Sequence, residues 1–211
     1  MNITMDEQRT EDWFSARLGK VTASRVADVM ARTKTGYSTS RDNYMAQLIC
    51  ERLTGQRQES YSNAAMEWGT ATEPLARAAY EIHKTVLVDE VGLIDHPFLP
   101  MCAASPDGLI SDDGMLEIKC PNTSTHFDTL LANKMPAKHM PQVQWQMACA
   151  NRLWVDFVSF DPRAPQKLQL FITRIERDDK YIKEMEAEVN KFLEELEQKI
   201  NQLLEFKNGN S

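Results

Sequence analysis

The spacing of apolar and polar positions changes along the chain. In the first third, apolar residues recur three to four positions apart, as they do on one face of a helix. With the flanking turn formers, this spacing predicts four helices. The first is capped by Thr10 and ended by Gly19, the second runs from Thr22 or Ser24 to Met30, and the third runs from Ser40 to Gly55. The fourth covers about 63–83, and Pro74 starts a new turn or a kink within it. Residues 33–40 are rich in turn formers and are expected to form a loop.

The middle of the chain changes to short alternating or β-branched runs, which are typical of strands. Expected strands lie within 85–95, 104–113, 114–121, 153–161 and 167–176. Helical spacing returns over about 125–133 and 140–151, and one long helix is expected over about 178–206. Helices followed by strands that are interleaved with helices predict one α/β domain over residues 1–211 with a central mixed sheet.

Two groups of apolar side chains lie in the later helices. Trp145, Met147 and Cys149 are interpreted as core residues. The final helix carries an apolar stripe at three- and four-residue spacing, made of Ile182, Met185, Val189, Phe192, Leu196, Ile200 and Leu203. Such a stripe needs a cover, which is either the rest of its own domain or another subunit.

Composition and charge narrow the class of protein. The 211 residues are 42% hydrophobic and 26% charged, the balance of a soluble globular protein. The net charge of −7 argues against a protein held to nucleic acid mainly by a basic surface, but the acidic final helix carries more than half of it, so a local basic channel is possible. No run approaches the roughly 18–20 apolar residues of a membrane span, and the first residues lack the apolar core of a secretory signal. The 4 Cys and 4 His are scattered without metal-ligating spacing, and free thiols in a reducing cytosol are expected.

The candidate chemistry is concentrated in two neighbouring segments, SPDG and LEIK. Alternate residues of a strand share a face, so Glu117 and Lys119 are expected to project together while Ile118 points to the opposite face. Asp107 begins the preceding strand, and a tight turn can bring it to the same place. Two carboxylates attract a hard divalent cation such as Mg²⁺, and a lysine beside them can orient the attacking water or stabilise phosphoryl charge. The alternative is a solvated hairpin with a surface salt bridge.

The whole series of motifs resembles a known family. Asp107, Glu117 and Lys119 match the pattern of the PD-(D/E)xK nuclease superfamily. Over about residues 10–160, the chain carries in order Trp13…Arg17-Leu18-Gly19…Thr22-Ala23-Ser24, Trp68-Gly69…Glu73, Ser105-Pro106-Asp107-Gly108, Glu117-Ile118-Lys119-Cys120-Pro121 and Gln142-Val143-Gln144. This series is similar to the lambda exonuclease (YqaJ) family of viral recombinases. The resemblance implies a restriction-endonuclease-like core, with a central mixed β-sheet flanked by helices.

The resemblance also implies catalytic roles for the matching residues. Asp107 and Glu117, with the backbone carbonyl of Ile118, would ligate Mg²⁺. Glu73 would contact a second metal ion or its water, and Mn²⁺ could substitute for Mg²⁺. Lys119 would position and activate the attacking water. On spacing alone, Glu73 is an ordinary glutamate on a helix surface.

A second group of matching residues is implied to bind DNA. Arg17 and Ser24 match positions that bind the 5′-phosphate of the degraded strand, and Ser105 and Gln142 match further site positions. A guanidinium offers a fork of donors that fits a terminal phosphate. Without the resemblance, Arg17 is a solvated helix arginine, Ser24 and Ser105 are caps, and Gln142 helps to begin a helix.

Taken as a whole, the resemblance implies a Mg²⁺-dependent 5′→3′ exonuclease on linear double-stranded DNA. It would release 5′-mononucleotides and leave 3′ single-stranded tails for phage recombination by strand annealing. The resemblance further implies a ring-shaped homotrimer, a single-strand annealing protein as partner, and a place in the bacterial host cytoplasm as a phage or prophage protein. The alternatives are a metal-dependent endonuclease or nickase, and a DNA-end-binding module without catalysis. The intact set of Asp107, Glu117 and Lys119 argues against the inactive module.

Overall fold

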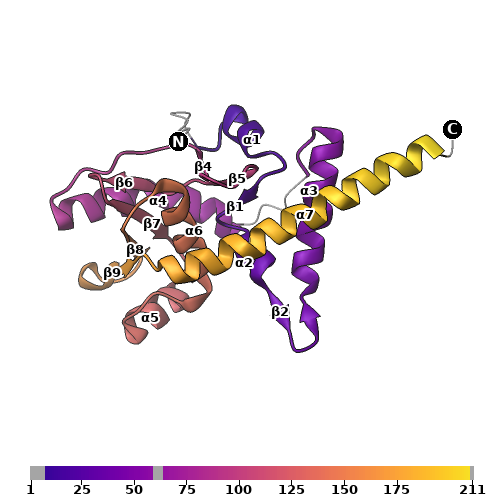
Figure 1. The fold of residues 1–211 in the computed structure, drawn as a ribbon. Coiled ribbons are helices and arrows are strands. Elements are labelled where there is room, and N and C mark those ends of the chain that lie inside the picture. The colour runs from indigo at the N-terminus through magenta and orange to yellow at the C-terminus, as the bar shows by residue number, and fades with distance from the viewer. Residues whose placement is uncertain (1–7, 59–63, 210–211) are drawn as a thin grey trace.

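The structure, a computed structural model, describes residues 8–58 and 64–209 (Figure 1). Its helices are α1 (Glu11–Arg17), α2 (Val26–Met30), α3 (Thr39–Thr54), α4 (Ala64–Lys84), α5 (Thr123–Ala132), α6 (Met140–Ala150) and α7 (Asp179–Gly209), with 3-10 turns at Ala137–His139 and Gln166–Leu168. Its strands are β1 (Val21–Thr22), β2 (Arg32–Thr33), β3 (Gly36–Tyr37), β4 (Ile94–Asp95), β5 (Cys102–Ala104), β6 (Gly108–Ile110), β7 (Gly114–Lys119), β8 (Trp154–Phe160) and β9 (Leu170–Glu176). The predicted α/β fold with a long final helix is confirmed.

The strands form two sheets and a hairpin. The main sheet has the order β6-β7-β8-β9, in which β7 is antiparallel to β6 and parallel to β8, while β8 and β9 are antiparallel. A smaller sheet has the order β1-β5-β4, and β1 runs parallel to β5. The mixed pairing matches the sequence prediction, but the strands are divided between two sheets.

Helices cover both faces of the main sheet. On one face α4 packs on β7, β8 and β9, and Tyr80 of α4 shares a buried cluster with Ile118. On the other face lies α6, whose Trp145 shares a second cluster with Phe157 of β8. Met147 and Cys149 are fully buried there, as the sequence predicted for this part of α6.

The long helix α7 completes the larger of these cores. Figure 1 shows it running diagonally across α2 and α3, with its last turns projecting beyond the body. Its apolar stripe is no more than 8% exposed at Ile182, Met185, Val189, Phe192, Leu196 and Ile200. Leu203 is 49% exposed. The chain itself therefore covers the stripe as far as Ile200.

Helix ends were predicted with mixed success. Thr10 caps α1 and Gly55 ends α3 in the left-handed conformation, with φ +65°, as predicted. The predicted caps of α2 are wrong, because its N-cap is Arg25 and makes no side-chain capping bond. Thr22 is taken up by β1, and the hydroxyl of Ser24 lies 3.4 Å from that of Thr22.

Two other predictions need correction, and the kink at Pro74 stays a prediction. Residues 33–40 are not a simple loop, because β2 and β3 pair there as a short hairpin. Pro74 lies inside α4, which is one helix; the start predicted near 63 lies outside the described residues. Segment 85–95 contributes the two-residue β4 and an isolated bridge at Asp89, and its apolar side chains divide between separate buried clusters.

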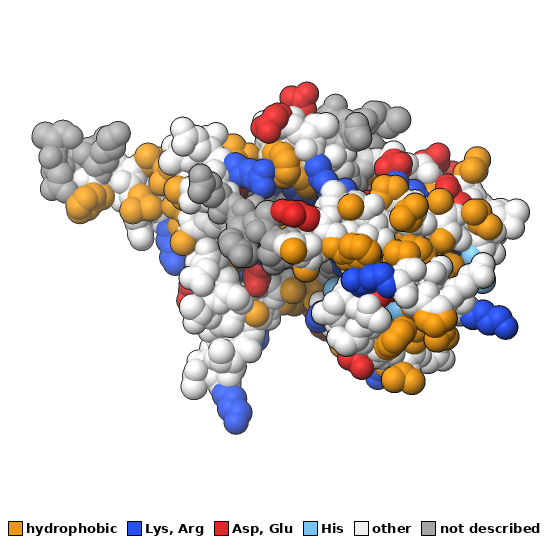
Figure 2. Space-filling view, turned by 180° about the vertical axis from the view of Figure 1, so that it is seen from behind, with side chains coloured by type: hydrophobic (Ala, Val, Ile, Leu, Met, Phe, Trp, Pro, Cys, Tyr) orange, Lys and Arg blue, Asp and Glu red, His pale blue; other side chains and the backbone are white. Residues whose placement is uncertain are grey.

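The surface mixes charge types. On the face in Figure 2, acidic and basic side chains are interspersed, with apolar patches between them. No helix of the described residues is long and apolar enough to cross a membrane. All 4 cysteines are free thiols.

Candidate active site

The carboxylates and the lysine singled out from the sequence lie together at the end of β7. Nζ of Lys119 is 2.5 Å from Oε1 of Glu117, as their shared strand face predicts. The pairing of β6 with β7 brings Asp107 alongside: its backbone N–H donates to the carbonyl of Leu116 at 3.1 Å, and its Oδ2 accepts from the backbone N–H of Ile118 at 2.6 Å. The three residues of the expected cleavage cluster are therefore in one place.

The glycine after Asp107 allows a close approach of the chain. A Cβ on Gly108 would lie 2.1 Å from Cγ1 of Val88, so no side chain fits there. The backbone of Asp89 forms a bridge with Leu109 in the next position. This packing fixes the beginning of β6 and with it the position of Asp107.

Glu117 is a buried carboxylate whose two oxygens both accept hydrogen bonds from α6. The side chain is 1% exposed, and Gln142 donates to Oε1 and Gln146 to Oε2, each at 2.6 Å. The two glutamines are four positions apart, so both lie on one face of the helix. Sequence reasoning found Gln142 and missed Gln146, although the four-residue spacing was a signal for it.

Glu73 lies on α4, and each of its oxygens pairs with an arginine. The guanidinium of Arg9 is 2.6 Å from Oε2, and that of Arg77 is 3.0 Å from Oε1. Sequence reasoning singled out neither arginine. The spacing of four residues from Glu73 was a signal for Arg77, whereas Arg9 is brought in by the tertiary fold.

A cavity of about 150 Å³ is lined by the two glutamines that bond to Glu117. Its lining includes all four residues predicted to bind DNA, together with two of the newly found residues: Arg17, Ser24, Ser105 and Gln142, with Arg9 and Gln146. The predicted phosphate-binding residues and the glutamines that hold the carboxylate thus share one cavity.

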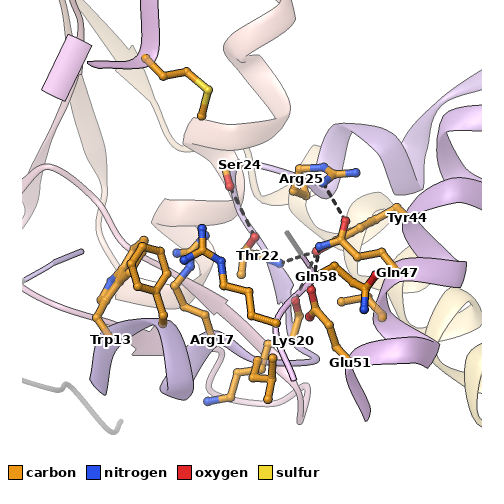
Figure 3. A pocket seen from close by; sticks show the side chains of 15 residues that line it. Trp13, Arg17, Lys20, Thr22, Ser24, Arg25, Tyr44, Gln47, Glu51 and Gln58 are labelled. Atoms are coloured by element: carbon orange, nitrogen blue, oxygen red, sulfur yellow. Dashed lines mark hydrogen bonds between the residues drawn. The ribbon is translucent and has the colours of Figure 1, made fainter. Parts of the chain in front are cut away.

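Arg17 is fixed within this cavity from two sides. Its guanidinium stacks over the ring of Trp13, 4.1 Å from the centroid, and donates to Oγ of Ser105 at 3.2 Å. The indole N–H of Trp13 donates to the same oxygen at 3.0 Å. Burial lowers the pKa of Arg17 to about 10, so the side chain is cationic at neutral pH. Figure 3 shows Trp13 and Arg17 across a second cavity, of about 280 Å³, from Arg25 and Tyr44.

This set of residues lies within a segment that matches a known family. Residues 12–152 match the YqaJ-like viral recombinase domain. The chain belongs to the YqaJ-like viral recombinase family. No curated protein matches it.

Solved structures place this YqaJ-like chain among exonuclease folds. LHK-Exo, an alkaline exonuclease from Laribacter hongkongensis, is 54% identical over 96% of this chain and 100% of its own, with a TM-score of 0.89. LHK-Exo in complex with dAMP matches over the same shares of both chains, with 55% identity and a TM-score of 0.90. A phage-related exonuclease from Haemophilus somnus 129PT is 16% identical over 87% of this chain and 96% of its own, and its TM-score of 0.71 shows a shared fold alone.

Charges in the YqaJ-like site shift the pKa values of its groups. Burial, and then the negative charges of Glu117 and Glu73, raise the pKa of Asp107 well above its usual value. Burial acts to lower the pKa of Lys119, but the charges of Glu117 and Asp107 outweigh it and the pKa is raised. With Asp107 ionised, the group of Asp107, Glu117 and Lys119 carries one excess negative charge that a bound cation would compensate.

The donors present in this YqaJ-like site fit a hard divalent cation. Among the described residues, no group of three or more His, Cys, Asp or Glu side chains is placed to hold a metal ion. Mg²⁺, however, is usually bound through one or two carboxylates and keeps several waters. Asp107 and Glu117, with the carbonyl of Ile118, would supply such an oxygen set. The contact of Glu73 with a second ion stays a prediction.

Proposed function

We propose that the protein is a Mg²⁺-dependent 5′→3′ exonuclease that degrades one strand of linear double-stranded DNA. It would release 5′-mononucleotides and leave 3′ single-stranded tails, and Mn²⁺ is expected to substitute for Mg²⁺. The observation that carries this proposal is the shared cavity, because Arg17 and Ser105 line it together with the glutamines that hold Glu117. A cationic pocket beside a cleavage cluster suits an enzyme that grips a terminal phosphate and cuts next to it.

In this proposal, the end of β7 carries out the cleavage step. Asp107 and Glu117, with the carbonyl of Ile118, would hold Mg²⁺, and Glu73 would face a second ion. The bound cation would lower the pKa of water and neutralise charge that develops on the phosphate. Lys119, protonated because its pKa is raised, would donate a hydrogen bond that orients the attacking water.

The proposal extends to assembly and partners. The protein would form a ring-shaped homotrimer around DNA and work with a single-strand annealing protein. It would act in the cytoplasm of a bacterial host as a phage or prophage protein. Support for these points comes from membership of the YqaJ-like viral recombinase family.

One assay tests the proposed reaction against its two alternatives. Linear duplex and covalently closed circular DNA are each incubated with the protein, with and without Mg²⁺. We expect Mg²⁺-dependent loss of the linear DNA and an unchanged circle. Cutting of the circle would instead indicate an endonuclease or nickase, and binding of ends without cleavage under all conditions would indicate an inactive end-binding module.

A variant of Arg17 tests the recognition of the DNA end. The wild type should degrade a 5′-phosphorylated duplex faster than a 5′-hydroxyl duplex, because a guanidinium can bind two oxygens of a terminal phosphate. Arg17→Ala should slow only the phosphorylated end. A charged hydrogen bond contributes on the order of 1.5–3 kcal/mol, so the ratio of initial rates should fall by roughly ten- to a hundredfold. Equal slowing on both ends would mean that Arg17 is a general DNA contact.

A further inference from the structure

The segment before α1 brings a second arginine to the cavity. Arg9 lines the same cavity as Arg17, although it comes from outside any helix or strand. Its side chain is 44% exposed, and its guanidinium is 2.6 Å from Oε2 of Glu73. The positive charge of Arg9 therefore lies between the cavity and the carboxylate of Glu73.

The backbone at Arg9 is in a conformation that needs support from the fold. Its φ is +72°, in the left-handed region that residues with a Cβ rarely adopt. The preceding side chain supplies an anchor, because Nε2 of Gln8 donates to the carbonyls of Val91 and Pro106, each at 2.8 Å. Pro106 directly precedes Asp107, so the anchor ties the position of Arg9 to the cleavage cluster. Left-handed conformations of this kind are concentrated at functional sites.

Among the described residues, Glu73 is the one acceptor of the Arg9 guanidinium. Of its five N–H donors, one bonds to Glu73 and no other described residue accepts from the rest. Glu73 also has Arg77 at 3.0 Å on its other oxygen. Arg77 is 11% exposed and contacts Glu90, a carboxylate that is 69% exposed to water. Arg77 is thus placed to balance the charge of Glu73, whereas the remaining donors of Arg9 meet no acceptor among the described residues.

We propose that Arg9 binds a phosphodiester of the strand that enters the cavity, between the pocket of Arg17 and the carboxylates of Asp107 and Glu117. The inference rests on the proposed function, since it requires DNA as the substrate. Arg9 would use Glu73 to fix its orientation and its free donors to contact the internal phosphate. Because that phosphate is present whether or not the end is phosphorylated, the interaction differs from the one predicted for Arg17.

Equilibrium binding as a function of salt tests this assignment. Affinities for short 5′-phosphorylated and 5′-hydroxyl duplexes are measured in a chelator at increasing KCl concentrations, so that only monovalent ions compete. Removing one cation that neutralises a phosphate should lower the slope of log K against log [KCl] by about 0.9. Arg9→Gln should lower the slope by this amount and weaken binding about tenfold on both duplexes. Arg9→Lys, which keeps the charge, should retain the slope.

The matched control is Arg77→Gln. It removes the other arginine that contacts Glu73, and Arg77 does not line the cavity. The slope of log K against log [KCl] for this variant should equal that of the wild type. Thermal melting of each variant reports folding. If Arg9→Gln lowers the melting temperature but leaves the slope of log K against log [KCl] unchanged, the proposal is overturned and Arg9 stabilises the fold without binding DNA. Weakening confined to the phosphorylated duplex would also overturn it, since Arg9 would then belong to the terminal-phosphate pocket. Absence of wild-type binding on both duplexes would instead refute the proposed function.

Discussion

The hold of α6 on Glu117 gives the sharpest test of how the site is built. Replacing Gln146 with Met keeps the length of the side chain and its burial but removes the amide that donates to Oε2 of Glu117 at 2.6 Å. Gln142 still donates to Oε1, so one of the two helix donors stays in place. The carboxylate would then be free to rotate away from the orientation that cation binding needs.

The expected size of the effect follows from this one hydrogen bond. A bond to a charged group contributes roughly 1.5–3 kcal/mol, and Glu117 is buried, so no bulk water replaces the missing donor. If all of this stabilisation is absent in the transition state, kcat should fall by about ten- to a hundredfold. The Mg²⁺ concentration for half-maximal activity should rise as well, because Glu117 is a proposed ligand.

The control comes from the same helix. Gln144 is as buried as Gln146, at 1% exposure, but it does not contact Glu117 through a hydrogen bond. Its Nε2 donates to the carbonyl of Glu176, and its Oε1 accepts from the backbone N–H of Asp178. Gln144→Met should lower thermal stability and leave kcat per folded molecule unchanged. Initial rates of nucleotide release, corrected for the folded fraction by circular dichroism, compare the two variants. A rate for Gln146→Met within twofold of the wild type would refute the positioning role.

Three further predictions concern cleavage, pH and the core. Asp107→Asn, Glu117→Gln and Lys119→Ala should each abolish nucleotide release while circular dichroism and DNA binding persist; near wild-type activity in one of them would remove that residue from the site. Burial, and then a nearby arginine, lower the pKa of His96 to about 4. As the pH falls, the unfolded chain therefore binds a proton at this histidine before the folded protein does. The free energy of unfolding should be largest above pH 6.5 and fall by about 3 kcal/mol toward pH 4. Urea titrations should show a shallower pH dependence in His96→Gln, and an equal one would contradict the argument. Phe192→Ala should cost about 3–5 kcal/mol of stability, because its side chain is fully buried; a loss below about 1 kcal/mol in the same titration would mean that the core does not depend on α7.

Local sequence patterns predicted the parts of the structure that depend on near neighbours. The alternation along β7 placed Glu117 beside Lys119 before any tertiary contact was known, because a strand has a fixed two-residue period. The cap at Thr10 and the stop at Gly55 were equally local. The cap of α2 failed because Thr22 pairs with β5, a contact about eighty residues away that overrides its local preference.

Local sequence patterns could not predict the parts of the site that depend on contacts between distant segments. Nothing near Arg9 indicates that it meets Glu73, since the pair is 64 residues apart in the chain. The stacking of Arg17 on Trp13 could be expected from their four-residue spacing, but their common partner Ser105 follows about ninety residues later. For Glu73, Arg17 and Ser105 the family resemblance supplied what periodicity could not, whereas neither the patterns nor the resemblance found Arg9.

The burial of α7 in the core has a consequence for how the protein is made. Every residue of the candidate site precedes Asp179, so the ribosome completes the site residues before it begins this helix. The stripe from Met185 to Ile200 fills the same buried cluster as Val21 and Trp145, and this core cannot close until the helix has left the exit tunnel. A nascent chain therefore carries every residue of the candidate site without the framework that aligns them. Activity would begin only after translation has passed Ile200, and products that end earlier would be substrates for cellular proteases.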